Sequence, residues 1–224
     1  MKKLILPGIV FMFLIFATTA GAAVFTVTPT SDNDCSDFNC DLQSALTAAA
    51  SNGQDDTINI AAGTYTVTSA LTYIPTAASA ENFALTIIEA GTGTTIVDGG
   101  ANAQLLNIDT TLLANGSLAA ITIKDLTITG SENVTISSNA PVTVPAINAG
   151  SVTVSGGTIQ LAGTIAATDE VMLNTGTPAI SGTGSIIAGG DISICSLNSC
   201  VAGNIISPGS LVITPAIKQI NYAA

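Results

Sequence analysis

The chain has no histidine and very few basic residues, 4 Lys and Arg together against 15 Asp and Glu. The formal net charge of −11 excludes nucleic acid and anionic membrane surfaces as partners, because both are bound through clustered basic side chains. Without histidine, a serine nucleophile lacks the base that normally activates it. Serine-based catalysis is therefore excluded as well.

Charged residues make up only 8% of the chain and aromatic residues 4%, whereas 47% of the residues are apolar. Disordered chains show the opposite balance, since they are rich in charge and poor in β-branched residues. The composition therefore predicts a folded chain whose polar surface consists mainly of hydroxyl and amide groups. The length suits a single domain.

The first 22 residues have the pattern of an export signal. Lys2 and Lys3 precede an apolar run from Leu4 to Phe16, and small residues follow as far as Ala22. We predict a Sec-type signal peptide over residues 1–22, and hence a secreted or cell-surface protein. The alternative is a membrane anchor, but this apolar run is shorter than the ~20 residues that span a bilayer.

The four cysteines form two pairs with the same spacing, Cys35 with Cys40 and Cys195 with Cys200. In an exported chain this pattern predicts two local disulfides. Zinc binding is the alternative, and it is disfavoured because there is no histidine and the two pairs lie far apart in the sequence.

Acidic residues surround the first cysteine pair, namely Asp32, Asp34, Asp37 and Asp41. Carboxylate oxygens are ligands for calcium, but the glycine and the final glutamate of a calcium-binding loop are missing here. We predict no metal and no cofactor, and we leave open a weak calcium site near Asp32 and Asp34.

One short helix is predicted, after the first cysteine pair. Apolar residues recur at helical spacing from Leu42 to Ala50, Asp41 stands at the N-cap position, and Asn52-Gly53 provides a stop. The rest of the chain consists of short β-branched runs broken by Gly, Asn, Asp and Ser. These runs predict strands at residues 24–28, 55–60, 64–68, 85–88, 94–97, 105–108, 121–123, 126–129, 134–136, 142–144, 152–154, 158–161, 171–173, 185–187, 192–194, 204–206 and 211–213.

The gaps between these strands favour a parallel β-helix over an antiparallel sandwich, because many contain only two to seven residues and few carry hairpin turn signals. We predict an all-β fold, a right-handed parallel β-helix with a short capping helix. Residues 23–68 would form the cap and first strands, and residues 69–224 the coils. Segments 69–82 and 101–118 break the pattern, so we expect them to project as loops and to offer a binding surface.

Residues 40–65 resemble the amino-terminal cap of bacterial right-handed β-helix surface proteins whose signature begins Cys-Ser-Leu-Arg-Glu-Ala, the CSLREA type. Here the segment begins Cys-Asp-Leu-Gln-Ser-Ala, so Gln43 and Ser44 replace an Arg and Glu pair and an ion pair is lost. Residues 149–194 resemble the repeats of haemagglutinin-type adhesins and autotransporter passengers. Both resemblances imply an exported surface β-helix, and neither implies a reaction.

Parallel β-helices also include polysaccharide lyases and hydrolases, which need a strong base or paired carboxylates. The candidate residues are Lys124, Asp169 and Glu170, but Lys124-Asp125 and Asp169-Glu170 both read as exposed turn residues. The Thr-x-Thr runs at residues 64–68 and 127–129 are similar to the arrays of ice-binding solenoids. They do not recur from strand to strand in the sequence, so we attribute them to β-propensity.

The sequence therefore predicts a non-catalytic structural or adhesive module, with no catalytic residue assigned. We expect its partners to be glycans or other surface proteins bound along a β-face, and self-association is also open. The alternative function is a polysaccharide-active enzyme.

Overall fold

The structure is a computed structural model that describes part of the chain. The described residues are 21–29, 35, 40–75, 83–91, 93–113, 119–176, 180–190, 192–196 and 213–215. The predicted signal peptide lies almost wholly outside them, as do the predicted strand at 204–206 and most of that at 211–213. The division into signal peptide, cap and coils stays a prediction.

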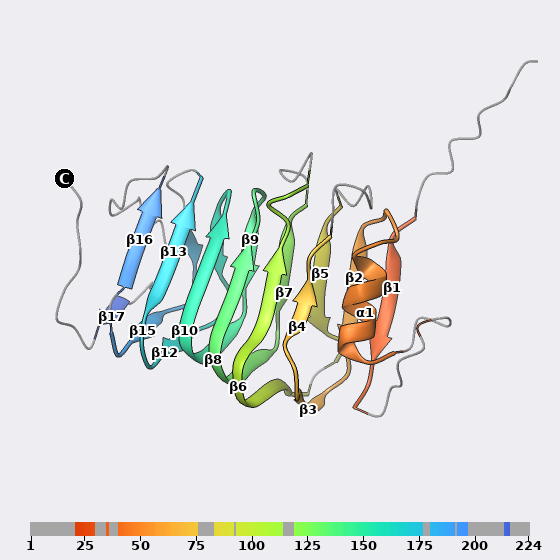
Figure 1. Cartoon of the computed structure of the whole chain (residues 1–224), viewed down its shortest axis with the longest axis horizontal. Coiled ribbons are helices and arrows are strands. Elements are labelled where there is room, and N and C mark those ends of the chain that lie inside the picture. The colour runs from red at the N-terminus through yellow and green to blue at the C-terminus, as the bar shows by residue number, and fades with distance from the viewer. Residues whose placement is uncertain are drawn as a thin grey trace, which may run out of the picture.

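The described strands form two sheets that run side by side along the long axis of the molecule (Figure 1). The seven-stranded sheet contains, in spatial order, β1 (Ala23–Val27), β2 (Asp56–Ile60), β5 (Leu85–Glu89), β7 (Ile121–Lys124), β9 (Val142–Val144), β11 (Ile159–Leu161) and β14 (Ile180–Gly182). The main path of the ten-stranded sheet contains β3 (Gly63–Thr66), β6 (Thr95–Asp109), β8 (Thr127–Ser137), β10 (Ala146–Gly156), β12 (Ile165–Ala167), β15 (Ile186–Ala188) and β17 (Ile213–Pro215). Three further strands complete this sheet: β4 (Leu71–Tyr73) pairs with β6, and β13 (Val171–Thr175) pairs with β10 and with β16 (Ile192–Ser196).

The pairings within both described sheets are parallel, from β1 with β2 to β15 with β17. Apolar residues pair with apolar residues along the sheet; for example, Ile159 lies opposite Val142 on one side and Ile180 on the other. An antiparallel sandwich, the alternative left open by the sequence, is therefore wrong. The fold is all-β with extended parallel sheets.

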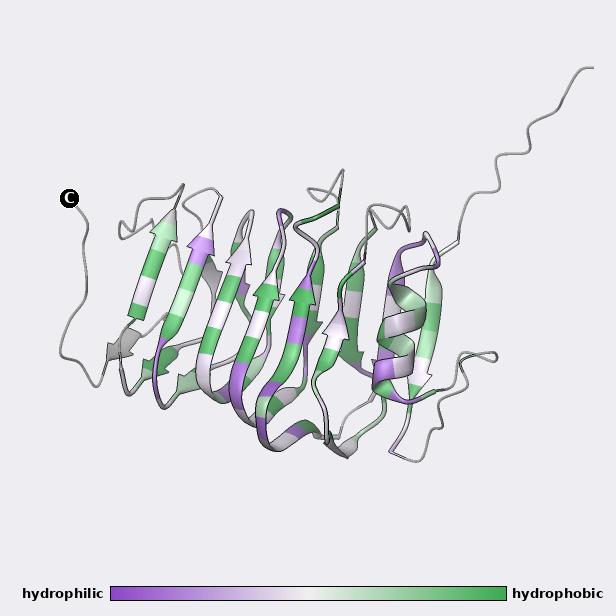
Figure 2. Cartoon of the chain, viewed as in Figure 1, coloured by the Kyte–Doolittle hydropathy of each residue, from purple (hydrophilic) through white to green (hydrophobic). Residues whose placement is uncertain are grey.

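Side chains alternate between the core and the surface along each strand, as the period of two in a strand requires. In β1, Ala23, Phe25 and Val27 are buried while the residues between them are exposed. Figure 2 shows the same alternation as hydrophobic and hydrophilic stripes across the strands. Most buried apolar residues of both sheets, and those of the helix, belong to one hydrophobic core.

Three strands of the ten-stranded sheet are much longer than the sequence predicts. β6, β8 and β10 span 15, 11 and 11 residues. β6 and β8 each join two predicted short runs into one bent strand, and β10 joins the predicted run 152–154 to a segment in which no strand was predicted. Residues 101–109 therefore lie within β6, and the expectation of a projecting loop over 101–118 is wrong for this part. The register shifts inside these strands, between Asn148 and Ala149 in β10 for instance, mark the position of the bend.

The prediction of a projecting loop over residues 69–82 is also partly wrong. Leu71–Tyr73 forms β4, which pairs in parallel with Leu106–Ile108 of β6 and buries Leu71 and Tyr73. Alternation of apolar and polar residues over only three positions is too short a signal to recognise a strand. Residues 76–82 and 114–118 lie outside the described residues, so a projecting loop there stays a prediction.

The predicted helix is confirmed as α1 (Leu42–Ala49), with Asp41 as its N-cap. The Asp41 carboxylate accepts hydrogen bonds from the Ser44 backbone N–H and the Ser44 hydroxyl, both at 2.9 Å. Such a cap contributes about 1 kcal/mol of stability. The helix ends at Ala49, earlier than the expected Asn52-Gly53 stop, and Gly53 (φ 71°) lies in the turn that follows.

α1 buries one face, formed by Leu42, Ala45, Leu46 and Ala49, against β1, β2 and β4. It lies at the end of the molecule where both sheets begin (Figure 1). The helix therefore covers the amino-terminal end of the core, as expected for a cap.

The cap also bonds to the outer edges of the first strands. The Cys40 backbone N–H donates to the Thr26 carbonyl oxygen of β1 at 3.2 Å. The side-chain amide of Gln43 donates to the Thr72 carbonyl oxygen of β4 at 3.1 Å and accepts from the Thr72 backbone N–H at 2.7 Å. Gln43 and Ser44 thus both have structural partners, Gln43 on β4 and Ser44 at the N-cap of α1.

The predicted Cys35–Cys40 disulfide is confirmed. It ties Cys40, the residue before the N-cap of α1, to Cys35 in the segment that follows β1, and Cys40 itself is fully buried. Cys195 is also disulfide-bonded, and its predicted partner Cys200 lies outside the described residues. Within the described part of the chain, no helix has the length and apolarity needed to cross a membrane.

Candidate functional site

The ten-stranded sheet bends where β8 and β10 change register, and a polar hollow follows this bend. The first half of β10, from Ile147 to Ala149, pairs with β12, whereas the second half, from Val152 to Gly156, pairs with β13. The chain between β12 and β13 crosses the same corner at Thr168 and Asp169. The bend therefore brings three successive segments of the chain together at one surface.

We call this hollow the bend groove; its volume is about 590 Å³. Its lining consists of short polar residues and glycines from three strands and one turn: Gly100, Thr129, Gly130, Ser131, Glu132, Asn133, Asn148, Ala149, Gly150, Ser151, Thr168 and Asp169. A volume of this size lies within the ~300–1,000 Å³ typical of small-molecule sites.

Glycine at position 150 is required by the close approach of the neighbouring strand. A Cβ at Gly150 would press against the Glu132 carbonyl oxygen, a contact too close for any side chain. On the opposite side, the Gly150 carbonyl oxygen accepts a hydrogen bond from the Asp169 N–H at 2.8 Å. Glu132, Gly150 and Asp169 therefore lie on three neighbouring segments of the chain, which we call layers. An acidic residue stands on each side of Gly150, which has no side chain to separate them.

Gly130 has a second conformational role in the groove. Its φ is 77°, a left-handed conformation that favours glycine, and the strand changes direction there. The Asp98 carboxylate faces this position from β6 and accepts a hydrogen bond from the Gly100 N–H at 2.9 Å. The side of the groove formed by β6 and β8 is therefore fixed by backbone contacts.

The bend groove is a polar surface that carries two acidic side chains. Its charged side chains, Glu132 and Asp169, are both exposed carboxylates, and its other polar groups are hydroxyls and amides. Some of these amides are already engaged, since Asn133 Nδ2 donates to the Ala103 carbonyl oxygen at 2.8 Å. Such a surface can accept and donate hydrogen bonds to a ligand rich in hydroxyl or amine groups.

The residues considered for chemistry from the sequence do not form one site. Asp169 lines the bend groove, whereas Glu170 is exposed beside it and does not line it. Lys124 ends β7 in the other sheet, and Asp125 follows in a left-handed turn with a φ of 60°. The pairs Lys124-Asp125 and Asp169-Glu170 thus lie on different parts of the molecule, and Lys124 belongs to a strand rather than to the expected turn.

Glu132 was missed by the sequence analysis. It stands in the segment Gly130–Asn133 between two predicted strands and has no acidic neighbour in the sequence. Its approach to Asp169 depends on the register of β8 with β10 and β13, which the sequence does not reveal.

A column of threonines on the outer face of the seven-stranded sheet was also missed. Thr57 pairs with Thr86, Thr86 with Thr122, and Thr122 with Thr143, in four successive strands. The Thr-x-Thr runs noted in the sequence do not form such a column, because Thr66 and Thr129 are both paired with Asp98. Thr57 and its partners lie on a regular strand surface, where threonine is favoured by β-propensity.

A second polar hollow, of about 390 Å³, lies at the far ends of β8, β10 and β13. Its lining, which includes Ser137, Asn139, Gly157 and Asn174, contains no charged side chain. The bend groove has two carboxylates that can orient a polar ligand, and the second hollow has none.

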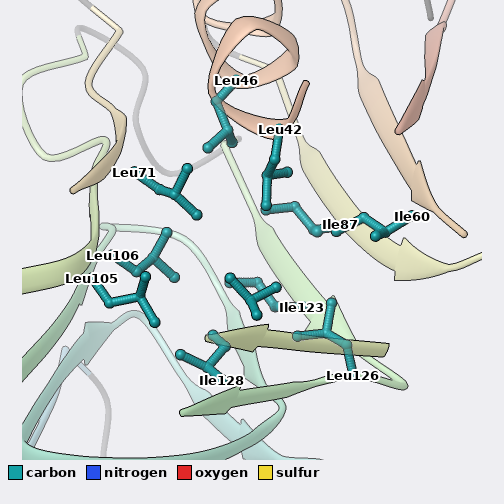
Figure 3. A pocket seen from close by; sticks show the side chains of 11 residues that line it. Leu42, Leu46, Ile60, Leu71, Ile87, Leu105, Leu106, Ile123, Leu126 and Ile128 are labelled. Atoms are coloured by element: carbon teal, nitrogen blue, oxygen red, sulfur yellow. The ribbon is translucent and has the colours of Figure 1, made fainter. Parts of the chain in front are cut away.

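An apolar cavity lies inside the core beneath α1 (Figure 3). Leu42 and Leu46 of the helix face Leu71, Ile87 and other apolar side chains of both sheets across it. Its volume of about 20 Å³ is close to that of a single water, and its lining is wholly hydrocarbon. It is a gap in packing beneath the cap and is too small for a ligand.

The described residues contain no group of three or more His, Cys, Asp or Glu side chains arranged to hold a metal ion. Of the acids considered for calcium, Asp41 caps α1, and Asp32, Asp34 and Asp37 lie outside the described part of the chain. A calcium site near Asp32 and Asp34 therefore stays an open prediction.

Comparison of the chain with family models, with curated proteins and with solved structures finds no match in any of the three.

Proposed function

We propose that the chain forms a right-handed parallel β-helix of the CSLREA-capped type, exported and displayed or released outside the cell. Hydrogen bonds of side-chain hydroxyls between successive layers support the coil geometry. In the carboxyl-terminal half they join residues 19 to 21 positions apart. This separation corresponds to a solenoid repeat of about 20 residues or slightly more. The disulfides are in keeping with an oxidising compartment outside the cell.

We propose further that the protein is a non-catalytic adhesive module that binds glycans in the bend groove. The observation that carries this proposal is the pair of exposed carboxylates, Glu132 and Asp169, on the two sides of Gly150 in a groove of hydroxyl and amide groups. A sugar chain presents many hydroxyls at regular intervals, and carboxylates are strong acceptors for them. Acidic glycans are disfavoured because the groove and the whole chain are negatively charged.

One observation favours an enzyme as the second candidate. The backbones of Glu132 and Asp169 are two layers apart, a distance of about 9.5 Å at the usual spacing of neighbouring strands. Carboxylates carried on backbones this far apart are compatible with the ~6.5–9.5 Å that separates the carboxyl groups of inverting glycosidases. The alternative is thus a polysaccharide hydrolase that uses these two residues, with neither Lys124 nor Glu170 in its site.

The two candidates are separated by measuring binding and turnover on the same panel. The panel contains neutral, amino-substituted and acidic oligosaccharides, and calcium is present in every measurement. We expect binding of neutral or amino sugars that falls at least tenfold in Glu132→Gln/Asp169→Asn, with no product released. Glu170→Gln is the matched control, because it removes an adjacent charge that does not line the groove, and it should bind as the parent does.

Turnover that disappears in Glu132→Gln/Asp169→Asn would replace the adhesive proposal with the hydrolase. Binding that is unchanged in the double variant would exclude the bend groove as the site. Absence of binding to every glycan in the panel would contradict glycan recognition altogether.

A further inference from the structure

The two polar hollows lie at opposite ends of the same three strand segments. β8, β10 and β13 are paired side by side in the ten-stranded sheet (Figure 1). The bend groove lies where these segments begin, and the second hollow, which we call the far hollow, lies where they end. β8 and β10 contribute residues to both linings.

Alternate residues of these strands connect the two hollows along the outer face of the sheet. Asn133 is paired with Ser151, and both line the bend groove. Ser137 is paired with Ser155, and both line the far hollow. Residues an even number of positions apart in a strand lie on the same face, so all four residues share the outer face. From Asn133 to Ser137 the distance is about 13 Å at the rise of a β-strand.

One row of outward side chains lies between the hollows. It consists of Thr135, Thr153 and Met172, which are paired across β8, β10 and β13. The two threonines are partly exposed, and Met172 is exposed. Short hydroxyl side chains and one flexible thioether thus form the surface that a ligand crosses between the hollows.

The two hollows differ in charge. Glu132 and Asp169 give the bend groove two carboxylates, whereas the described residues that line the far hollow carry hydroxyl and amide groups. Asn174 is exposed at the far hollow, and its side chain offers both a donor and an acceptor. A ligand that fits both hollows therefore presents neutral hydrogen-bonding groups along its whole length, with hydroxyl or amine groups at the acidic end.

We propose that the two hollows are subsites for one linear oligosaccharide, which lies parallel to β8, β10 and β13 and crosses the row formed by Thr135, Thr153 and Met172. This inference rests on the proposed function, glycan binding in the bend groove, and adds to it the length of the ligand and its direction. A disaccharide held in the bend groove does not reach the far hollow, whereas a tetrasaccharide contacts both. The linings favour a sugar chain over an extended peptide, because neither contains the apolar pockets that hold peptide side chains.

The length of the ligand is tested by calorimetry on the full chain. The probes are linear oligosaccharides, from the disaccharide to the hexasaccharide, of one neutral hexose and of the matching amino sugar. In the series that binds, we expect the tetrasaccharide to bind at least about tenfold more tightly than the disaccharide, because contact with the far hollow adds two or more hydrogen bonds. Longer chains should gain little more, since both hollows are then filled.

Gly176→Gln places a side chain in the far hollow. Gly176 lines this hollow, and a Cβ added there would lie 3.7 Å from the Gly157 Cα, an ordinary contact. In this variant the tetrasaccharide should bind no more tightly than the disaccharide, whose affinity should equal that of the parent. Gly91→Gln is the matched control, because it lines neither hollow and nothing lies within 4 Å of the Cβ that it adds. It should keep the full gain with length.

Asn174→Ala is a second variant, which removes an amide from the far hollow without adding volume. It should lose at least part of the gain with length, and it decides the question if Gly176→Gln does not fold. A gain that survives in both variants would overturn the second subsite, as would the same loss in Gly91→Gln or equal affinities of the parent for the disaccharide and the tetrasaccharide.

These results are distinguishable from failure of the proposed function. If affinity does not depend on length but falls in Glu132→Gln/Asp169→Asn, the bend groove stays the glycan site and the far hollow is not part of it. Absence of binding at every length would contradict the proposed function itself, and the second subsite with it.

Discussion

The Tyr65 hydroxyl lies 3.1 Å from the Val27 carbonyl oxygen and 2.8 Å from the Ala61 carbonyl oxygen. It joins β3 of one sheet to the end of β1 in the other. Burial raises the pKa of the Tyr65 hydroxyl above its usual value near 10. The folded state therefore holds this proton more tightly than the unfolded chain does.

This difference predicts how stability changes at alkaline pH. Below pH ~10 the hydroxyl is protonated in both states, and its contribution to stability is fully present. As the pH rises through the raised folded pKa, the unfolded state loses the proton first and stability falls. Urea unfolding between pH 8 and 11 measures this loss, and Tyr65→Phe should be less stable at pH 8 by about 1 kcal/mol with a flatter pH profile. An equally steep profile in Tyr65→Phe would assign the alkaline loss to another group.

Gly150→Ala should destabilise the protein, because its Cβ would press against the Glu132 carbonyl oxygen of the adjacent layer. We expect a loss of about 1–3 kcal/mol in the free energy of unfolding, as for other overpacked positions. Gly91→Ala is the control, since nothing lies within 4 Å of the Cβ that it adds. It should change stability by no more than about 0.5 kcal/mol. Equal effects of the two substitutions would show that the layers at Gly150 are less closely stacked than described.

Thr110→Val should stabilise the protein. The Thr110 side chain is fully buried and its hydroxyl oxygen has no hydrogen-bond partner among the described residues. Removal of an unsatisfied buried hydroxyl regains part of a desolvation penalty of about 1–3 kcal/mol. In contrast, Thr175→Val removes a buried hydroxyl that donates to the Cys195 carbonyl oxygen at 3.4 Å, and it should be destabilising. Thermal unfolding of both variants checks the opposite signs, and a loss of stability in Thr110→Val would contradict the assignment.

Val97→Ile should fill part of the apolar cavity beneath α1, which Val97 lines. An added methylene that fits this space contributes about 0.8 kcal/mol. Val152→Ile makes the same change at a fully buried position that does not line the cavity, and overpacking there should cost about 1–3 kcal/mol. Denaturant midpoints distinguish the two. Destabilisation by both variants would mean that the cavity wall is too rigid to accept the extra carbon.

The cap could be predicted from the sequence because its signals are local. The helical spacing from Leu42 to Ala49 and the N-cap residue Asp41 lie within one short segment, and so does the Cys35–Cys40 disulfide. The partners of Gln43 could not be predicted, since Thr72 is 29 residues away and lies in a strand that was read as a loop.

The bend groove could not be predicted for a related reason. Single strands were recognised from their β-branched residues, but the register between layers is set by the length of each turn. Glu132 and Asp169 come together only through β10, whose two halves were read as one short strand and an irregular segment. The same difficulty hid the threonine column that begins at Thr57, because its members are far apart in sequence.

The parallel registers have a consequence for how such a molecule can change its length. Val142, Ile159 and Ile180 are paired one after another without a shift in register. Each layer therefore offers the next layer the same pattern of apolar and hydrogen-bonding positions. A duplication or loss of one whole layer away from both cysteine pairs would leave the start of the structure untouched. The length of the molecule along its long axis can therefore change by whole layers without any change in the covering at the amino-terminal end.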